Sequence, residues 1–396
     1  MVFDDLNGDE LRAGLPRTYR YFASKGTVFP NYICENPQCG PARGTLLTGR
    51  ASHNGIRTNA GAAAGIDGPT IVNRLKSVNY RTALFGKYLN GYGRGTPTGW
   101  DHFDTESGGD NKHTNEGEYI TDYYKRVVLR WLDQNNKGSR FVYVAPHTPH
   151  TPFIPARRHQ HLFKGFKARR GRPSFNEEDV SDKPLVVRTL PKVNEGRLNR
   201  IGRKRLQMLR SCDEMIMRII AKQKQQNRLQ NTFFVIVSDN GFLLGDHRLE
   251  TKGRPYDASI RVPMLAMGPG LGKGETSQRL VAVQDVATTA AKVARVKLER
   301  TDGRDFRQGR SRNRTHVLIQ RYSKNLGWFG LRSLDYLYVE HPTGEKEYYD
   351  LRKDPNELDN LLANWKGHTP RLSQQRQNML TSQLRAAKGC RGATCP

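Results

Sequence analysis

The chain has 396 residues, enough for one large domain with a buried core and a smaller second one. Its 65 Lys and Arg against 38 Asp and Glu give a formal net charge of +27, which fits either a polyanionic partner or a solvated surface biased by genome composition. No apolar run is long enough to span a bilayer, and no helix-turn-helix, RRM or zinc-finger pattern is present, so we expect neither a membrane nor a specific nucleic acid as partner.

Short apolar runs alternate with amphipathic segments through the first three quarters of the chain. This alternation predicts an α/β fold in which helices flank a sheet. The expected strands are rich in β-branched or aromatic residues and are Arg81–Phe85, Phe141–Ala145, Thr232–Ser238 and Pro263–Met267. The expected helices are Pro69–Asn79, Tyr119–Asn135 and Leu206–Lys222. Phe163–Leu198 is basic and weakly periodic, which predicts a long surface excursion.

The character of the sequence changes near residue 305. His316–Gln320, Tyr336–Glu340 and Lys346–Leu351 read as antiparallel strands, with a turn at residues 342–345. A last helix is expected over Pro370–Lys388. We therefore predict a main domain over residues 1–305 and a smaller C-terminal α+β lobe over residues 306–396, whose antiparallel sheet packs on the main domain.

The five cysteines include a close pair at the chain end. Cys390 and Cys395 enclose a loop of small residues, which favours a disulfide and an oxidising compartment. Two free thiols on a frayed tail are the alternative. The first residues, Met1–Asp5, lack the basic and apolar segments of a signal peptide, so export is not written in this sequence itself.

The most informative segment is Cys39-Gly40-Pro41-Ala42-Arg43, followed by Gly44–Arg50. It resembles the signature of the sulfatase family, C-x-[PA]-[SA]-R, with a Leu-Thr-Gly-Arg segment at the family's spacing. The resemblance implies that Cys39 is oxidised to formylglycine, which requires a formylglycine-generating enzyme as a partner. A buried structural cysteine is the alternative that the motif alone leaves open.

The resemblance extends almost to Cys395, and it implies an alkaline-phosphatase-like fold. That fold has a large mixed, mostly parallel sheet flanked by helices. In sulfatase-like sequences a paired aspartate ends the first core strand, and here only Val2 and Phe3 precede Asp4 and Asp5, so this strand reads as truncated at its start. A secreted or otherwise extracytoplasmic location is expected.

An oxygen-rich set of side chains matches the family's metal site. It combines Asp4 and Asp5 with Asp239 and Asn240 of the Ser-Asp-Asn-Gly segment, beside Cys39. Carboxylate and amide oxygens favour a hard cation, so the expected cofactor is calcium, or magnesium in its place. An Asp-Asn-Gly turn without a metal is the alternative.

Cations and histidines complete the catalytic set that the resemblance implies. Arg43, Lys87 and Lys252 match the family's motif positions and would face sulfate oxygens. The Pro-His-x-Pro segment makes His150 the expected proton donor, but Pro146-His147-Thr148-Pro149 repeats the pattern, so His147 stays a second choice.

The chain departs from many sulfatases after Lys87. Leu89 and Asn90 stand where a second histidine is common, and Gly-Lys-Tyr-Leu-Asn is instead typical of the glucosamine-6-sulfatase-like branch. His53 is the nearest alternative for the second base. Asn90, His53, His147 and His247 are the expected substrate-binding residues.

Together these features predict a sulfuric ester hydrolase that acts through a formylglycine hydrate on an aryl sulfate or a sulfated carbohydrate. A 6-O-sulfated N-acetylglucosamine is the first substrate to expect, and the basic clusters at residues 157–172, 197–210 and 304–314 would attract an anionic glycan. Two alternatives remain open: a phosphonate or phosphate ester hydrolase on the same scaffold, and a non-catalytic polyanion-binding protein. The oligomeric state cannot be inferred.

Overall fold

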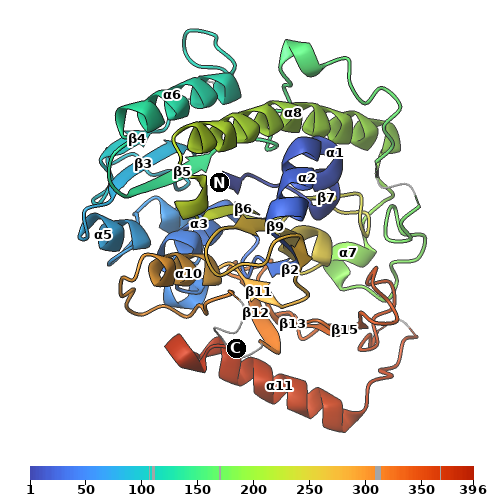
Figure 1. The fold of residues 1–396 in the computed structure, drawn as a ribbon. Helices are drawn as coiled ribbons and strands as arrows, with labels where there is room; N and C mark the ends of the chain where they lie inside the picture. Colours follow the sequence, from blue (N-terminus) through green and yellow to red (C-terminus); the bar gives the residue numbers. More distant parts are fainter. Residues whose placement is uncertain (107, 109–111, 169–170, 308–313, 366) are drawn as a thin grey trace.

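The computed structural model describes all of residues 1–396 except 107, 109–111, 169–170, 308–313 and 366 (Figure 1). Its main sheet has the strand order β1-β6-β9-β2-β10, with β11 also beside β2. These strands are β1 Val2–Phe3, β6 Phe234–Ser238, β9 Arg261–Met267, β2 Thr27–Ile33, β10 Glu275–Thr276 and β11 Val281–Ala282. Strand β9 is antiparallel to both neighbours, whereas the other pairs are parallel, so the sheet is mixed.

A second sheet is wholly parallel and has the order β4-β3-β5, formed by His102–Asp104, Arg81–Gly86 and Arg140–Ala145. A cavity of about 560 Å³ lies between β5 and β6, lined by apolar side chains of both strands and by Met1. Burial at the edge of this cavity lowers the pKa of the Met1 amine to about 5.

Helices cover both faces of the sheets (Figure 1). One apolar cluster joins the sheets to α1 Gly8–Gly14, α2 Pro16–Lys25, α6 Ile120–Gln134 and α8 Glu195–Gln225. A second cluster on the opposite side involves α3 Cys39–Thr48, α4 Asn59–Ala62, α5 Ile71–Lys76 and α10 Asp285–Val293. None of the described helices is long and apolar enough to cross a membrane.

The C-terminal part forms an antiparallel sheet, β12-β13-β14-β15. Its strands are His316–Arg321, Trp328–Ser333, Tyr336–Glu340 and Lys346–Asp350, and α11 Gln374–Lys388 packs on it through Leu380 and Leu384. Cys390 and Cys395 form the predicted disulfide. The predicted α/β fold with a separate antiparallel sheet is confirmed, and the division at residue 305 stays a prediction.

The predicted elements are present with shifted ends, but one helix is much longer than expected and several elements were not predicted. Helix α8 begins at Glu195, eleven residues before its expected start at Leu206, so the expected surface excursion is partly helical. Strands β2 and β13 and helices α1, α2 and α10 are among the elements that the sequence did not predict. The short elements α7 Leu185–Arg188, α9 Asp257–Ile260, β7 Leu243–Leu244 and β8 Glu250–Thr251 lie in the segments between the longer elements.

Candidate active site

The candidate metal ligands follow two adjacent strands. Strand β1 pairs with β6 in parallel, with Phe3 opposite Ser238, so Asp4 and Asp5 leave the sheet beside Asp239. The carboxyl ends of strands are where sites gather in such sheets. Asp5 has a left-handed backbone (φ 70°), and its N–H donates to Oδ1 of Asp239 at 3.1 Å. The strand pairing therefore brings together carboxylates that are more than 230 residues apart in the sequence.

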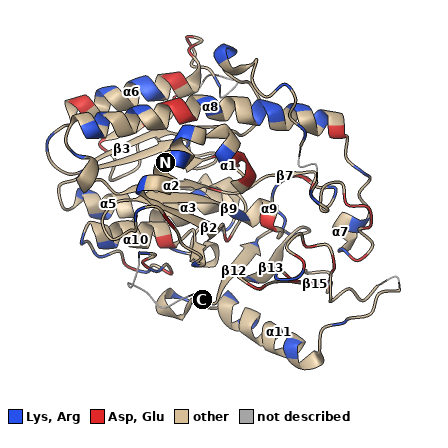
Figure 2. Cartoon of the chain, turned by 45° about the vertical axis from the view of Figure 1, so that its right-hand side comes forward, with Lys and Arg blue, Asp and Glu red and all other residues tan. Residues whose placement is uncertain are grey.

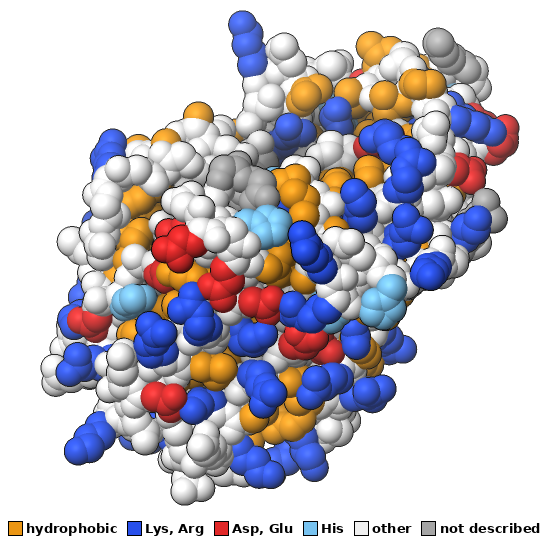
Figure 3. All heavy atoms as spheres, turned by 90° about the horizontal axis from the view of Figure 1, so that it is seen from above, with side chains coloured by type: hydrophobic (Ala, Val, Ile, Leu, Met, Phe, Trp, Pro, Cys, Tyr) orange, Lys and Arg blue, Asp and Glu red, His pale blue; other side chains and the backbone are white. Residues whose placement is uncertain are grey.

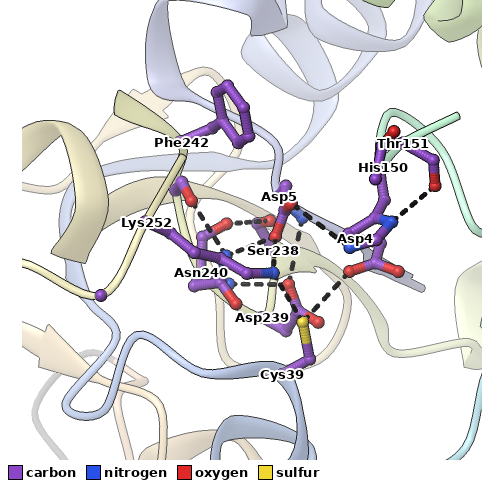
Figure 4. A network of polar contacts seen from close by, with 12 residues as sticks. Asp4, Asp5, Cys39, His150, Thr151, Ser238, Asp239, Asn240, Phe242 and Lys252 are labelled. Atoms are coloured by element: carbon purple, nitrogen blue, oxygen red, sulfur yellow. Dashed lines mark hydrogen bonds and ion pairs between the residues drawn. The ribbon is translucent and has the colours of Figure 1, made fainter. Parts of the chain in front are cut away.

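Cys39 is the first residue of α3 and its side chain is buried. Pro41 lies within the first turn of this helix, where proline is tolerated. The Sγ atom lies 3.4 Å from Oδ1 of Asp4 and 2.7 Å from Nζ of Lys252 (Figure 4). Burial, followed by the charges of Asp239 and Asp4, raises the pKa of this thiol to about 12.

The site offers a ligand set that fits a hard divalent cation. One potential ligand atom from each of Asp4, Asp5, Cys39 and Asp239 lies within 4.8 Å of all the others, and all four residues are buried. Asn240 donates from Nδ2 to Oδ1 of Asp5 at 2.6 Å. Its own Oδ1 is buried without a hydrogen-bond partner among the described residues. A buried oxygen normally has a partner, so this atom is suited to be a metal ligand.

Three cations face these carboxylates. Arg43 donates from Nε to Oδ2 of Asp239 at 2.9 Å, and Lys87 donates from Nζ to Oδ2 of Asp4 at 2.7 Å. Lys252 contacts Oδ1 of Asp5 as well as Cys39. Although burial opposes the charge of Lys87, Asp4 outweighs it and raises the pKa of this lysine. Conversely, Lys87 and Arg43 hold the pKa of Asp4 well below its usual value despite its burial.

The two candidate histidines occupy different environments. His150 follows β5, with Nε2 3.8 Å from Oδ2 of Asp5, and its Nδ1 donates to the carbonyl of Thr151 at 2.7 Å (Figure 4). His147 is half-buried, with its Nδ1 atom shielded from solvent, and this desolvation lowers its pKa to about 3. Its carbonyl accepts a hydrogen bond from Nζ of Lys112 at 2.6 Å. Of the two, His150 is the one whose ring lies within 4 Å of a candidate metal ligand in the described part of the chain.

His53 and His247 belong to other groups of contacts. Nε2 of His53 lies 3.0 Å from the carbonyl of Cys390, and Gln320 of β12 contacts its Nδ1. Nδ1 of His247 lies 2.5 Å from Oε2 of Glu177, and this buried pair raises the pKa of His247 to about 9 although burial alone would lower it. Among the described residues, these two histidines therefore do not contact the group formed by Asp4, Asp5, Cys39 and Asp239.

Asn90 lies in the loop after Lys87. Its side-chain Oδ1 is buried and has no hydrogen-bond partner within the described residues. Its proposed contact with substrate stays a prediction.

Two supporting residues were missed by the motifs. Arg205 of α8 donates to the backbone carbonyl of Asp5 at 2.5 Å and to Oε1 of Glu10 at 2.6 Å, and all three residues are buried. Cys34 donates from Sγ to the carbonyl of Asp239 at 2.7 Å. The sequence did contain a signal for Arg205: it lies on the apolar side of helix α8, on the same face as Gly202 and Leu209.

Comparisons with known proteins identify the family and relatives of this chain. A sequence model of the sulfatase family matches residues 4–296. The chain is 30% identical over 324 residues to an extracellular sulfatase Sulf-1 homologue of Caenorhabditis elegans, covering 74% of this chain and 46% of that one. It is 28% identical over 333 residues to the N-acetylglucosamine-6-sulfatase of Homo sapiens, covering 74% and 60%. The chain thus spans about half the length of these relatives.

Solved structures share the fold. A protein crystallised with D-glucosamine-2-N,6-O-disulfate, described as its substrate, superimposes with a TM-score of 0.81 at 22% identity, covering 97% of this chain and 96% of that one. A phosphonate monoester hydrolase of Agrobacterium radiobacter gives 0.77 at 20% identity, covering 96% and 94%. Because the family model covers most of the sequence, the chain belongs to the sulfatase family.

Proposed function

We propose that this chain is a sulfuric ester hydrolase that cleaves sulfate monoesters with a nucleophile formed from Cys39. The observation that carries the proposal is the contact of one buried sulfur with both a carboxylate and an ammonium group, since Cys39 lies against Asp4 and Lys252. A hydrolase of sulfate esters needs a nucleophile, positive charge at the sulfate oxygens and a proton donor for the leaving alcohol. Each of these has a candidate within this cluster.

The roles follow from the contacts. Asp4, Asp5, Asp239 and the amide oxygen of Asn240 would hold calcium or magnesium, which would withdraw charge from the sulfate oxygens when bound. Oxidation of Cys39 to formylglycine would supply the nucleophile at this position. The proposed roles of the chain's other residues are to orient the sulfate, through Arg43, Lys87 and Lys252, and to protonate the departing alcohol, through His150.

A sulfated carbohydrate is the proposed substrate, with 6-O-sulfated N-acetylglucosamine as the first candidate. The names of the human relative and of the ligand in the solved structure support this class. Lys and Arg lie along both α6 and α8 (Figure 2) and are spread over the face seen from above (Figure 3), as suits an anionic glycan. The disulfide and the names of the extracellular relatives support an extracytoplasmic location.

The test is turnover by protein produced together with a formylglycine-generating enzyme. Peptide mass spectrometry across Cys39 measures its conversion, and matched aryl sulfate, phosphate and phosphonate esters measure the reaction. We expect the sulfate ester to be preferred and at least one sugar 6-sulfate to be hydrolysed. Preference for the phosphonate ester would favour the alternative hydrolase. Salt-sensitive heparin binding by converted protein without any turnover would favour a polyanion-binding protein.

A further inference from the structure

The hairpin formed by β12 and β13 ends against the loop that carries Lys252. Arg321 and Trp328 are directly opposite each other in the register of this hairpin, at the end closed by its turn. Arg321 donates from Nη1 to the backbone carbonyl of Gly253 at 2.6 Å, and Trp328 donates from Nε1 to the same oxygen at 3.1 Å. Two donors from the C-terminal sheet therefore converge on one carbonyl.

The amide N–H of Gly253 is hydrogen-bonded as well as its carbonyl. The N–H of Gly253 donates to Oγ of Ser259 at 3.1 Å, and the carbonyl of Ser259 accepts from Gly241 at 2.9 Å, next to the candidate ligand Asn240. Gly253 has φ +87°, and a Cβ there would lie 2.7 Å from Nη1 of Arg321. The backbone at this point is thus fixed between the C-terminal sheet and the metal-ligand turn, in a conformation that requires glycine.

Lys252 is the residue immediately before this fixed point. Its ammonium group contacts Cys39 and Asp5 at the end of a four-carbon stem, which has many rotamers in a free lysine. Fixing the backbone next to the stem limits where the ammonium can lie. Trp328 is completely buried, so its indole cannot move to follow a shift of the loop.

We propose that Arg321 and Trp328 are positioning residues for Lys252, so that the C-terminal sheet completes the catalytic site. The inference rests on the proposed function, in which Lys252 faces the sulfate ester. Neither residue touches the reacting atoms; both act through the carbonyl of Gly253.

The first variant is Trp328→Phe, which removes the donor and keeps an aromatic ring in the core. We expect kcat on a sugar sulfate to fall by roughly 10-fold or more, with KM within about twofold, because small displacements of a positioned group cost rate. On 4-nitrophenyl sulfate we expect a similar loss, because Lys252 is proposed to face the sulfate group, which both substrates share. Trp365→Phe is the matched control, since Nε1 of Trp365 donates to the carbonyl of Ser181 at 3.0 Å, a hydrogen bond that involves none of the candidate site residues.

Arg321 gives an independent arm. Arg321→Met should lower kcat in the same way, and Arg321→Lys, which retains a donor, should restore part of it. Arg228→Met is the control, because Arg228 donates to the backbone carbonyl of Asn136 at 2.7 Å. Thermal unfolding of all variants identifies any that fail to fold.

Coupling to Lys252 separates positioning from a general structural role. In a Lys252→Met background, Trp328→Phe should cause little further loss on 4-nitrophenyl sulfate, because the group that it positions is absent. An undiminished loss in that background, or equal losses from Trp328→Phe and Trp365→Phe, would overturn the proposal.

Hydrogen exchange provides a readout that needs no turnover. Trp328→Phe should accelerate exchange in the peptide over residues 249–256, whereas Trp365→Phe should not. If the converted wild-type protein hydrolyses no sulfate ester, the proposed function fails, but hydrogen exchange still tests whether Trp328 fixes the backbone at Gly253. Unchanged exchange in Trp328→Phe would overturn the proposed positioning role of Trp328 even in an active enzyme.

Discussion

Nζ of Lys87 lies 2.7 Å from Oδ2 of Asp4, so a candidate sulfate-binding cation is hydrogen-bonded to a candidate metal ligand. Arg43 and Asp239 repeat the arrangement at 2.9 Å, and Lys252 and Asp5 form the third pair. Three buried or nearly buried carboxylates are therefore matched by three cations even before a divalent ion is considered. This balance means that the fold does not depend on the metal to neutralise the cluster.

Removal of the metal should accordingly abolish activity without unfolding the protein. Treatment with a strong chelator is expected to reduce turnover to background, and calcium or magnesium should restore it. The measurements are activity, elemental analysis and the melting temperature of the same samples. Full activity in protein shown to be metal-free would contradict the proposed site.

Substitution of the candidate nucleophile gives the second prediction. Cys39→Ala should eliminate turnover and change stability by about 1 kcal/mol or less, because a single buried sulfur is removed and the flanking charges still pair with each other. Turnover and urea unfolding check the two parts. A variant that retains most of its rate would end the assignment of Cys39.

The buried pair of His247 and Glu177 predicts a dependence of stability on pH. The pKa of His247 is raised from 6.5 to about 9 in the folded state, so its contribution is complete below pH 6.5 and is lost as pH rises through 9. The loss could reach about 3 kcal/mol, since one unit of pKa corresponds to about 1.4 kcal/mol. Glu357, with a pKa raised to about 7, destabilises the fold as pH rises from 4.5 to 7, and its contribution is complete above that.

The comparison with His247→Gln isolates the histidine, because the Met1 amine, with a pKa lowered from 8.0 to about 5, and Lys112, with a pKa lowered from 10.5 to about 8, stabilise the fold as pH rises through parts of the same interval. Urea unfolding should show that the stability of the native protein relative to His247→Gln decreases from pH 7 to 9. A difference between the two proteins that stays constant from pH 7 to 9 would contradict the raised pKa.

The disulfide between Cys390 and Cys395 should resist alkylation in unreduced protein. Replacing both cysteines with serine is expected to lower the free energy of unfolding by about 2 kcal/mol or less, because so short a loop restricts the unfolded chain little. The loop is also held by hydrogen bonds, including one from Gly392 to Asp302 at 2.6 Å. Labelling of both cysteines in native, unreduced protein would show that the bond is absent.

The net charge of +27 predicts a salt effect on substrate capture. The value of kcat/KM on a sulfated oligosaccharide should fall more steeply with added salt than the value on a small aryl sulfate, because screening weakens long-range steering. If kcat/KM fell equally with salt for both substrates, the surface charge would have no role in attracting the oligosaccharide.

Short-range patterns predicted most of the site, because its residues lie in motifs at the ends of strands. The positions of Asp4, Asp239 and Lys87 were expected from such motifs, and the structure places them in one cluster. Long-range support could not be read in this way. The hydrogen bonds of Arg205 to the backbone of Asp5 and of Cys34 to that of Asp239 depend on packing between distant segments, which no local pattern records.

The errors in the fold have similar causes. Strand β2 contains Pro30, and its pairing with β9 shifts between Phe29 and Tyr32, so its sequence lacks a regular alternation. The first turns of α8 are rich in arginine and lysine, and their helical period becomes visible only when the buried Arg205 is counted with the apolar face. Strand β13 contains Gly330 and Arg332, both buried in the sheet, which obscures its β character.

The burial of Cys39 also bears on when it can be modified. Lys252, which covers its sulfur, lies 213 residues later in the chain. At about 5 to 20 residues per second, ribosomal synthesis of that interval takes roughly 10 to 40 s. If Cys39 is oxidised as proposed, an enzyme that recognises the extended motif would have this interval of synthesis before β6 and the Lys252 loop close over the thiol. Folding would then compete in time with oxidation, and this competition would favour modification of the nascent chain over modification of the finished protein.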